Sequence, residues 1–553
     1  MAYSPETRKK NIAKLQSEEF DIAIIGGGIT GAGVARDAAS RGLKVALIEA
    51  DDFASGTSSR SSKLIHGGIR YLENLEFGLV FEALRERRNL FEIAPHLVHP
   101  LRFVLPIYKS SRVGMFKMGL GMFLYDALSM FEAPELHESL TSRATIERVS
   151  MLKPDGLSGS YVYSDAYMDD DRLVIETLRS AANFGACTAN YVRATGAKYD
   201  SSPNSQGALT ALLCNDTESG KSFEVKARHF ISTVGPWTDR VGELLLKNNW
   251  RRMLRPSKGI HLTFRRDRLQ LNDAVVMATD DQKRIIFAIP RHEMIVVGTT
   301  DTDYPGDPGD VHSTTEDVDY LLNIVNEYFP GANLSRLDIL ASYSGVRPLV
   351  DDGAETESKT SREHVITTLP QKVTFVAGGK YTTYRQMAED TVLNVLATFS
   401  LEDRIRFSKT RTLEPLNPLA TEATLWRSEQ MAESWASEAG IDVDTAHFLV
   451  ERHGEEAIKI VESFALKGFS SLQKNLRWHI EAQHAIRDTM CLHLRDYYLR
   501  RSPLFLARPD HGLIMVNEIA QVFQHELGWS DETKATEIEA LRKHLKQEMG
   551  WRG

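Results

Sequence analysis

Cysteine is scarce in this sequence, because the 553 residues contain only three. Cys187, Cys214 and Cys491 stand far apart, and no two of them have C-x-x-C spacing. This spacing excludes a disulfide framework and a cysteine-rich zinc centre, and we predict no metal site. Free thiols are typical of a reducing compartment, so we expect a cytoplasmic location.

Long apolar runs are also missing. The most apolar long window, Met115 to Phe131, contains Lys117 and Asp126 and is too short to span a bilayer. The first 19 residues include basic side chains, but they lack the apolar stretch that a signal peptide needs. We therefore expect a chain that does not cross a membrane.

The chain has no excess of positive charge. It contains 66 basic and 75 acidic side chains, which gives a formal net charge of −9. That balance argues against nucleic acid as a partner, because neutralising its phosphates requires clustered positive charge. With 42% hydrophobic and 25% charged residues, the composition is that of a globular protein. The length suggests about two to four domains.

A strand–helix–strand unit is predicted near the start. Phe20 to Ile25 is a short apolar run typical of a buried strand, and Gly31 to Arg41 is an alanine-rich segment typical of a helix. Gly42 stops that helix, and Val45 to Ile48 forms a second strand. This order predicts two parallel strands with a right-handed connection.

The turn between the first strand and the helix matches the dinucleotide fingerprint G-x-G-x-x-G. The positions expected to contact a cofactor there are Gly26, Gly28, Ile29, Thr30 and Gly31. The first glycine permits a tight turn, the second lets a pyrophosphate approach the backbone, and the third allows close packing. The free N–H groups of the helix N-terminus favour phosphate. Glu49, at the end of the second strand, can bind a ribose diol.

The segment from Asp52 to Glu73 is rich in hydroxyl groups and glycine. Its backbone N–H groups and hydroxyls can surround the second half of a dinucleotide, which favours FAD over a nicotinamide cofactor. The hydroxyls in question belong to Thr57, Ser58, Ser61 and Ser62. The alternative is a flexible surface loop, but the apolar Leu64-Ile65 and Tyr71-Leu72 indicate that the segment packs against the protein.

Three structural regions are predicted further along the chain. His229 to Val234 and Val373 to Ala377 are expected as strands that return to the first sheet. Between them, β-branched segments such as Ile285 to Ile289 indicate a second, antiparallel sheet. From about Leu401 onward the spacing of apolar residues is helical.

The sequence thus predicts an α/β protein with a Rossmann-like FAD-binding domain, an antiparallel-sheet substrate domain and a C-terminal helical domain. We assign residues 18–100, 150–242 and 340–400 to the FAD-binding domain. The substrate domain is expected to comprise 101–149 and 243–339, and the helical domain 401–553.

Eight sequence blocks resemble the FAD-dependent glycerol-3-phosphate dehydrogenase family. They occur in the family's order over roughly residues 20–395. The blocks are GGGITGAGVARDAASRGLKVALIE, SSRSSKLIHGGIRYLE, YSDAYMDDDRLV, VGPWTDRV, KGIHL, VVGTTDTDYPGDP, YSGVRPL and AGGKYTTYRQMAE. The resemblance implies oxidation of sn-glycerol 3-phosphate to dihydroxyacetone phosphate, with hydride transfer to FAD and delivery of the electrons to quinone.

The matching blocks also suggest further cofactor contacts and an anchor for the substrate phosphate. The added cofactor positions are Lys63, His66, Gly235, Gly379, Lys380 and Thr382. Arginine suits a dianionic phosphate because its fork forms paired, charge-assisted hydrogen bonds. At family-motif positions, the expected substrate-binding side chains are Arg70, Tyr71, Arg347 and Arg362.

Two histidines within the matching blocks are alternative proton acceptors for the substrate hydroxyl, His66 and His261. We expect His261 to contact the substrate, and the choice of the base stays open. Lys380 follows two glycines and precedes a predicted helix, where its ammonium group would favour negative charge on reduced flavin or on a substrate oxygen. We therefore expect His66, His261, Arg347 and Lys380 to serve catalysis.

Several alternatives remain at this stage. A glycerol-3-phosphate oxidase, which uses oxygen, shares the motifs, but it resembles this chain except for a middle insertion that is missing here. Amino-acid oxidases would bind a carboxylate, and a noncatalytic flavin-binding protein is a further alternative. Lys109 to Phe131 is expected to touch the inner face of the cytoplasmic membrane, although core packing explains that segment as well. The helical tail is compatible with a homodimer or with a solvated surface.

Overall fold

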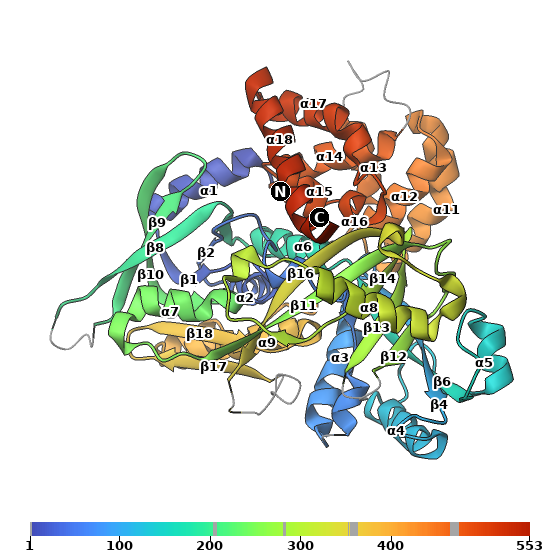
Figure 1. Ribbon diagram of the computed structural model, residues 1–553. Helices are drawn as coiled ribbons and strands as arrows, with labels where there is room; N and C mark the ends of the chain where they lie inside the picture. The colour runs from blue at the N-terminus through green and yellow to red at the C-terminus, as the bar shows by residue number, and fades with distance from the viewer. Residues whose placement is uncertain are drawn as a thin grey trace.

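The computed structural model describes residues 3–73, 75–202, 207–279, 284–351, 353, 363–464 and 475–552, without the side chains of Arg70 and Asn248. Two sheets lie side by side, and the helices of the C-terminal domain cover one end of the molecule (Figure 1). This architecture confirms the predicted fold class.

The first sheet has the strand order β17-β18-β10-β1-β2-β7. Its strands are β1 (Glu19–Ile25), β2 (Val45–Ile48), β7 (Cys187–Ala189), β10 (Lys221–Ser232), β17 (His364–Leu369) and β18 (Val373–Gly378). Strand β10 also pairs with β9 (Leu209–Asp216), and β9 pairs with β8 (Val192–Tyr199). Strands β1, β2, β7, β10 and β18 run parallel. In this register Ile22 of β1 stands beside His229 of β10, so the two predicted returning strands do join the sheet.

Three helices pack together on this sheet: α2 (Ile29–Ser40), α6 (Asp170–Asn183) and α9 (Tyr384–Leu396). Gly33 lets α9 approach α2, because a Cβ atom there would lie 2.9 Å from the ring of Tyr384. Ile22 and Ile24 of β1 point into the same core and are fully buried. The N-terminal helix α1 (Pro5–Ser17) packs near β7 and β10, and α7 (Thr238–Leu246) follows β10.

The second sheet has the order β15-β11-β14-β13-β12-β4-β6-β3, with β16 on β11 and β5 on β6. Its strands are β3 (Leu64–Ile65), β4 (Val98–Tyr108), β5 (Glu138–Thr141), β6 (Leu157–Met168), β11 (Leu254–Arg265), β12 (Ala274–Ala278), β13 (Ile285–Arg291), β14 (Met294–Gly298), β15 (Thr302–Asp303) and β16 (Ile339–Val350). Within the described residues, its pairings are antiparallel except that of β12 with β4. The helices that flank it are α3 (Phe77–Ile93), α4 (Met115–Leu128), α5 (Ser142–Arg148) and α8 (Thr315–Tyr328).

Three strands of the second sheet lie wholly or almost wholly inside ranges that the sequence assigned to the FAD-binding domain. These are the two-residue β3 within 18–100, β6 within 150–242, and β16, which begins one residue before 340–400. The two long strands among them are β6 and β16. Both strands are buried along most of their length on both faces. Strands buried on both faces lack the alternation that would tell a core-facing side from a solvent side, so their sequence does not indicate which sheet they join.

The C-terminal domain is helical, as predicted. Its helices are α10 (Leu401–Arg406), α11 (Glu422–Ala439), α12 (Val443–His453), α13 (Glu456–Ser463), α14 (Leu476–Thr489), α15 (Leu494–Arg500), α16 (Leu504–Ala507), α17 (Val516–Leu527) and α18 (Asp531–Glu548). Trp478 and Tyr497 of this domain share one buried core with Leu262 and Ile339 of the second sheet. Across the described ranges, no helix combines the length and the apolar character needed to span a bilayer.

Candidate active site

The glycine turn joins β1 to α2 at the centre of the first sheet. Gly26 has a φ of 107°, a conformation that side chains rarely adopt. At Gly31 a Cβ atom would lie 1.9 Å from the carbonyl oxygen of Gly26, so only glycine allows this close packing. Helix α2 begins after Gly28, which has no side chain to cap the helix. The turn therefore presents helix N–H groups of the kind that bind phosphate.

Glu49 lies at the end of β2, beside this turn. Its Oε2 accepts a hydrogen bond from the N–H of Gly27 at 2.7 Å, and its Oε1 accepts one from the N–H of Asp51 at 3.0 Å. Burial raises the pKa of the Glu49 carboxyl, and the two backbone donors partly offset that effect. The predicted ribose-binding acid is thus adjacent to the predicted pyrophosphate site.

The segment from Glu49 to Lys63, which we call the cofactor loop, packs between the two sheets. Ser58 Oγ accepts a hydrogen bond from the N–H of Ile29 at 3.0 Å. Thr57 Oγ1 donates to the carbonyl oxygen of Val346 at 2.6 Å, which ties the loop to β16. The loop is therefore fixed to both sheets and is not the exposed, flexible segment of the alternative interpretation.

Lys63 closes this loop in a left-handed conformation, with a φ of 56°. Its side chain is buried, and its ammonium group forms an ion pair with Asp170 at the start of α6. It also lies 5.6 Å from the ring centre of Tyr343. In this structure the charge of Lys63 thus balances a buried carboxylate.

His261 on β11 is fully enclosed. Its ring stacks on that of Tyr343 with 4.7 Å between centroids, and its Nε2 forms a hydrogen bond of 2.8 Å with Ser62 Oγ. Gly298 on β14 makes room for the ring, since a Cβ atom there would lie 2.2 Å from it. Burial, together with the nearby charges of Arg347 and Lys63, holds the pKa of His261 well below its usual value. The imidazole is therefore neutral at pH 7.

Arg347 on β16 lies close to His261 and is held by the chain segment after β14. Its guanidinium group donates to Thr299 Oγ1 at 2.8 Å and to the carbonyl oxygen of Thr300 at 3.1 Å, and it pairs with Asp301 at 3.1 Å. The peptide bond that precedes Thr299 is cis. The side chain keeps 22% of its surface exposed, so the cation is oriented and still accessible.

A second group of predicted side chains gathers where the cofactor loop is followed by β3 and the short helix 69–72. Thr382 Oγ1 accepts a hydrogen bond from the N–H of His66 at 3.2 Å and donates to the His66 carbonyl oxygen at 3.3 Å. The ammonium group of Lys380 lies 3.9 Å from the centre of the Tyr71 ring. His66, Tyr71 and Lys380 are all partly exposed. The fold thus brings these segments together, although more than 300 positions separate them in the chain.

Of the remaining predicted positions, some lie in described segments and others lie outside them. Gly235 and Gly379 occupy turns with positive φ, 54° after β10 and 86° after β18. Thr30 lies in the first turn of α2. Arg362 and the side chain of Arg70 lie outside the described residues.

Three side chains at the site were not singled out from the sequence: Asp170, Asp301 and Tyr343. Asp170 pairs with Lys63, Asp301 pairs with Arg347, and Tyr343 stacks on His261. All three stand within the blocks that carry the family resemblance. A buried lysine or arginine needs a carboxylate partner. The run of acidic residues Asp169 to Asp171 was the sequence signal that pointed to such a partner.

The residues at the turn fit FAD. Gly28 itself provides no side-chain cap for α2, and the space in front of it would be taken by any side chain, because a Cβ atom there would lie 3.0 Å from Ser58 Oγ. Glu49 provides acceptors for a ribose diol at the neighbouring strand end. The cofactor loop adds the hydroxyl groups of Thr57, Ser58 and Ser62.

Comparison with known proteins gives matches to both halves of the chain. A family model described as FAD dependent oxidoreductase matches residues 21–385. A second model, described as the C-terminal domain of alpha-glycerophosphate oxidase, matches residues 421–534. The first match includes the glycine turn, the cofactor loop and both groups of site side chains.

Full-length relatives and a solved structure agree with these matches. The aerobic glycerol-3-phosphate dehydrogenase of Staphylococcus saprophyticus is 33% identical over 550 residues, covering 99% of this chain and 97% of that protein. The alpha-glycerophosphate oxidase of Streptococcus pneumoniae is 34% identical over 602 aligned positions, covering 97% of both chains. The structure of the Bacillus halodurans glycerol-3-phosphate dehydrogenase complexed with FAD is 27% identical, with a TM-score of 0.78 over 98% of both chains. The chain therefore belongs to the FAD-dependent oxidoreductases, in the family of aerobic glycerol-3-phosphate dehydrogenases and alpha-glycerophosphate oxidases.

Proposed function

We propose that this protein oxidises sn-glycerol 3-phosphate to dihydroxyacetone phosphate, with FAD as cofactor and a membrane quinone as electron acceptor. The observation that carries the proposal is the oriented guanidinium group of Arg347, which the second sheet holds near the cofactor loop. Relatives named for this substrate match nearly the full chain.

Arg347 and Lys380 are the groups that we assign to the anionic part of the substrate. Arg347 is held through Thr299, Thr300 and Asp301, so binding a phosphate requires little reorganisation of its side chain. A guanidinium group suits phosphate oxygens because it donates two parallel hydrogen bonds. An amine or amino-acid oxidase would bind the carboxylate group of its substrate, and this alternative explains the relatives less well.

His66 is our choice for the proton acceptor. When bound, FAD supplies the acceptor for the hydride that leaves the carbinol carbon. The hydroxyl proton then needs a base that the substrate can reach, and His66 is partly exposed, whereas His261 is 2% exposed. The hydrogen bond between His261 and Ser62 gives His261 a role in holding the cofactor loop instead.

The alignments favour a dehydrogenase over an oxidase. The comparison with the Streptococcus pneumoniae oxidase extends over 602 positions, although this chain has only 553 residues. That oxidase therefore carries additional residues that have no counterpart here. The Staphylococcus saprophyticus dehydrogenase aligns over 550 positions without such an excess. This difference supports quinone as the acceptor.

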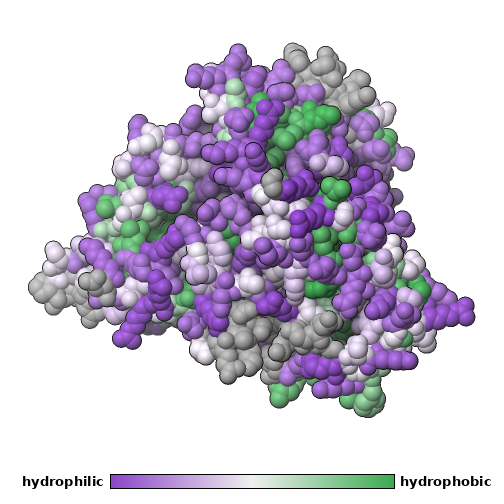
Figure 2. Space-filling model, viewed as in Figure 1, coloured by the Kyte–Doolittle hydropathy of each residue, from purple (hydrophilic) through white to green (hydrophobic). Residues whose placement is uncertain are grey.

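An apolar surface on α4 supports contact with the membrane that holds the quinone. Phe116 is 83% exposed, and Leu120 and Phe123 are each 59% exposed. In Figure 2, apolar residues lie along the lower edge of the molecule, in the region of α3 and α4 in Figure 1. The nearby Lys109 and Lys117 are exposed and suit anionic headgroups.

The location that we propose is the inner face of the cytoplasmic membrane. Cys187, Cys214 and Cys491 are all free and buried, which suits a reducing compartment. The apolar and basic residues of α4 would rest on the anionic lipid surface there. Quinone could then receive electrons without a transmembrane helix.

Anaerobic addition of sn-glycerol 3-phosphate to the FAD-loaded protein tests this proposal. We expect the flavin absorbance to bleach, and a soluble quinone to restore it at least about tenfold faster than air-saturated buffer does. Fast recovery in oxygen with formation of peroxide would support the oxidase instead. A yellow protein that ignores the substrate would support the noncatalytic alternative.

A further inference from the structure

Charged side chains of the helical domain hold the cofactor loop just after Glu49. Asp52 is fully buried, and its carboxylate accepts a hydrogen bond of 2.6 Å from Arg500 and bonds of 2.8 and 2.9 Å from Arg501. Both arginines are buried at the end of α15. Although burial opposes its ionisation, the two guanidinium groups lower the pKa of Asp52 to about 2, so this carboxylate stays charged at neutral pH.

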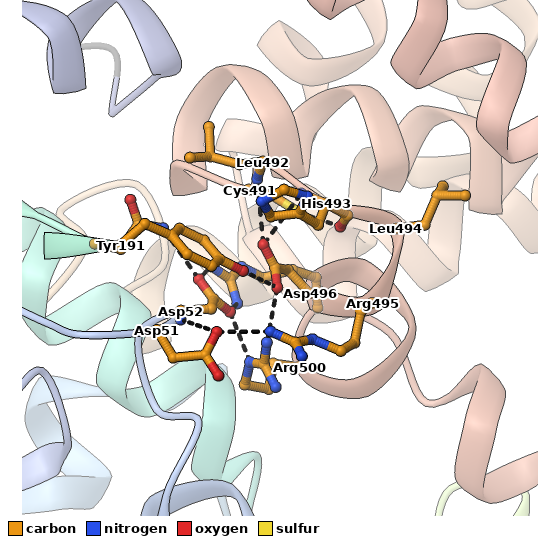
Figure 3. A network of polar contacts seen from close by, with 12 residues as sticks. Asp51, Asp52, Tyr191, Cys491, Leu492, His493, Leu494, Arg495, Asp496 and Arg500 are labelled. Atoms are coloured by element: carbon orange, nitrogen blue, oxygen red, sulfur yellow. Dashed lines mark hydrogen bonds and ion pairs between the residues drawn. The ribbon is translucent and has the colours of Figure 1, made fainter. Parts of the chain in front are cut away.

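Neighbouring residues extend this contact into a network (Figure 3). Arg495 donates to Asp51 at 2.6 Å at the edge of the network, where both side chains are partly exposed. Deeper inside, Asp496 accepts hydrogen bonds from Arg500 at 2.8 Å and from the hydroxyl group of Tyr191 at 2.7 Å. The network therefore joins the loop after β2 to α15, two segments separated by more than 400 positions.

The residues next to Asp52 in the chain touch the cofactor turn directly. The N–H of Ala54 donates to the carbonyl oxygen of Gly27 at 3.0 Å. The Phe53 ring closes the space over the same glycine, where a Cβ atom would lie 2.6 Å from the ring. On the other side, the N–H of Asp51 donates to Glu49. Displacing Asp52 would therefore shift both the glycine turn and the ribose-binding acid.

A second ion pair fixes the far part of the same loop. Arg60 pairs with Glu548 of α18 at 2.6 Å, and Glu548 is 3% exposed. Arg60 stands two positions before Ser62, which bonds to His261. The helical domain thus holds the cofactor loop near its start and near its end.

Buried ion pairs contribute little to net stability compared with apolar residues of the same volume, because desolvation offsets the attraction between the charges. They do enforce one geometry, since an unpaired buried charge is costly. The cluster of four buried charged groups, Asp52, Asp496, Arg500 and Arg501, is therefore better explained by a requirement for exact loop placement than by stability alone.

We propose that the helical domain positions the cofactor loop, so that docking of this domain and binding of FAD stabilise each other. Asp51, Asp52, Arg495, Arg500 and Arg501 act as positioning residues, since their ion pairs join the loop to the end of α15. The proposal requires FAD binding, the cofactor part of the proposed function, but not the choice of quinone as acceptor.

The rate at which FAD leaves the holoenzyme, followed by flavin fluorescence after dilution, tests the proposal. We expect Asp52→Asn to raise this rate by about tenfold or more, and Asp51→Asn or Arg495→Gln by about threefold. The last two variants alter partly exposed side chains and should fold normally. Arg427→Gln is the matched control, because it removes an exposed ion pair with Glu455 elsewhere in the helical domain, and it should leave the rate unchanged.

A second measurement separates positioning from general stability. FAD raises the melting temperature by an amount that reflects its affinity, and we expect Asp51→Asn and Arg495→Gln to reduce this rise. A purely structural effect would lower the melting temperatures of the apo and holo forms equally, which would overturn the proposal. Arg500→Lys should retain more FAD than Arg500→Met. Unchanged dissociation rates in all loop variants would also refute the proposal, whereas a wild-type protein without FAD would refute the proposed function itself.

Discussion

The ammonium group of Lys380 lies 3.9 Å from the centre of the Tyr71 ring. This contact fixes a cation between the segment after β18 and the short helix that follows the cofactor loop. The ring face attracts the cation and holds it beside this helix. This placement supports our proposal that Lys380 stabilises negative charge that develops during the reaction.

Replacing Lys380 by alanine should slow reduction of bound FAD by sn-glycerol 3-phosphate by about 100-fold, since an electrostatic contribution to the transition state is lost. Anaerobic stopped-flow measurement of flavin bleaching gives this rate. Tyr71→Phe keeps the ring and should change the rate by less than about threefold. An unchanged rate in FAD-loaded Lys380→Ala would remove the assigned role.

Arg347→Lys should raise the KM for sn-glycerol 3-phosphate by about 10- to 100-fold, because lysine keeps the charge but cannot form paired hydrogen bonds with phosphate. The change in kcat should be smaller. Steady-state kinetics with a soluble quinone measure both constants. Arg336→Gln, which removes an exposed pair with Asp319, serves as the control and should behave like the wild type. Equal KM values in all three proteins would contradict the assignment.

Gly31→Ala should destabilise the protein by about 3 kcal/mol and abolish FAD binding, because the new methyl group would meet the carbonyl oxygen of Gly26. Denaturant unfolding and the flavin content of the purified protein test this expectation. Gly78→Ala, in α3, has no atom within 4 Å of the new methyl group. It should be neutral or slightly stabilising.

His229 should make stability depend on pH. Burial lowers its pKa to about 4, and its Nε2 forms a hydrogen bond with Thr374. An unfolded histidine takes up a proton near pH 6.5. Between about pH 6.5 and pH 4 the unfolded state therefore binds more protons, and stability falls as the pH falls.

This contribution can be isolated with a non-titrating replacement. His229→Gln should reduce the loss of unfolding free energy between pH 7 and pH 4.5 by about 2 kcal/mol. Thermal and denaturant unfolding at both pH values provide the comparison. His447→Gln, which changes a partly exposed histidine on α12, is the control. The same pH dependence in all three proteins would show that His229 does not titrate as described.

Phe116→Ser combined with Phe123→Ser should weaken binding to anionic vesicles by about tenfold or more, because two exposed aromatic side chains no longer enter the interface. Co-sedimentation with vesicles of mixed neutral and anionic lipid measures the effect. Trp426→Ser removes a side chain that is 68% exposed on the helical domain and should leave binding unchanged. Failure of the wild type to bind such vesicles would exclude this surface.

The first strand, the glycine turn and Glu49 could be predicted from the sequence because they depend on neighbours within about 30 positions. The allocation of β6 and β16 between the sheets could not, since both are buried on both faces and show no alternation of apolar and polar residues. The sequence also did not distinguish His66 from His261. Their difference lies in burial, which Tyr343 and Gly298 impose on His261 from other strands.

The contact between Asp52 and Arg501 shows the same limit. In the sequence each residue alone has the pattern of a surface charge, and 449 positions separate the two. Only the packing of the helical domain on the first sheet brings these charges together. Pairings of this range have no local signal in a single sequence.

The parallel pairing of β1 with β10 also has a consequence for biosynthesis. Strand β1 pairs with β10, where Ile22 stands beside His229, and β18 then pairs with β10. During translation, β1 and α2 leave the ribosome long before either of these strands has been made. The nascent chain must keep this apolar segment from aggregating for most of its synthesis, so efficient production should depend on chaperones that bind nascent chains.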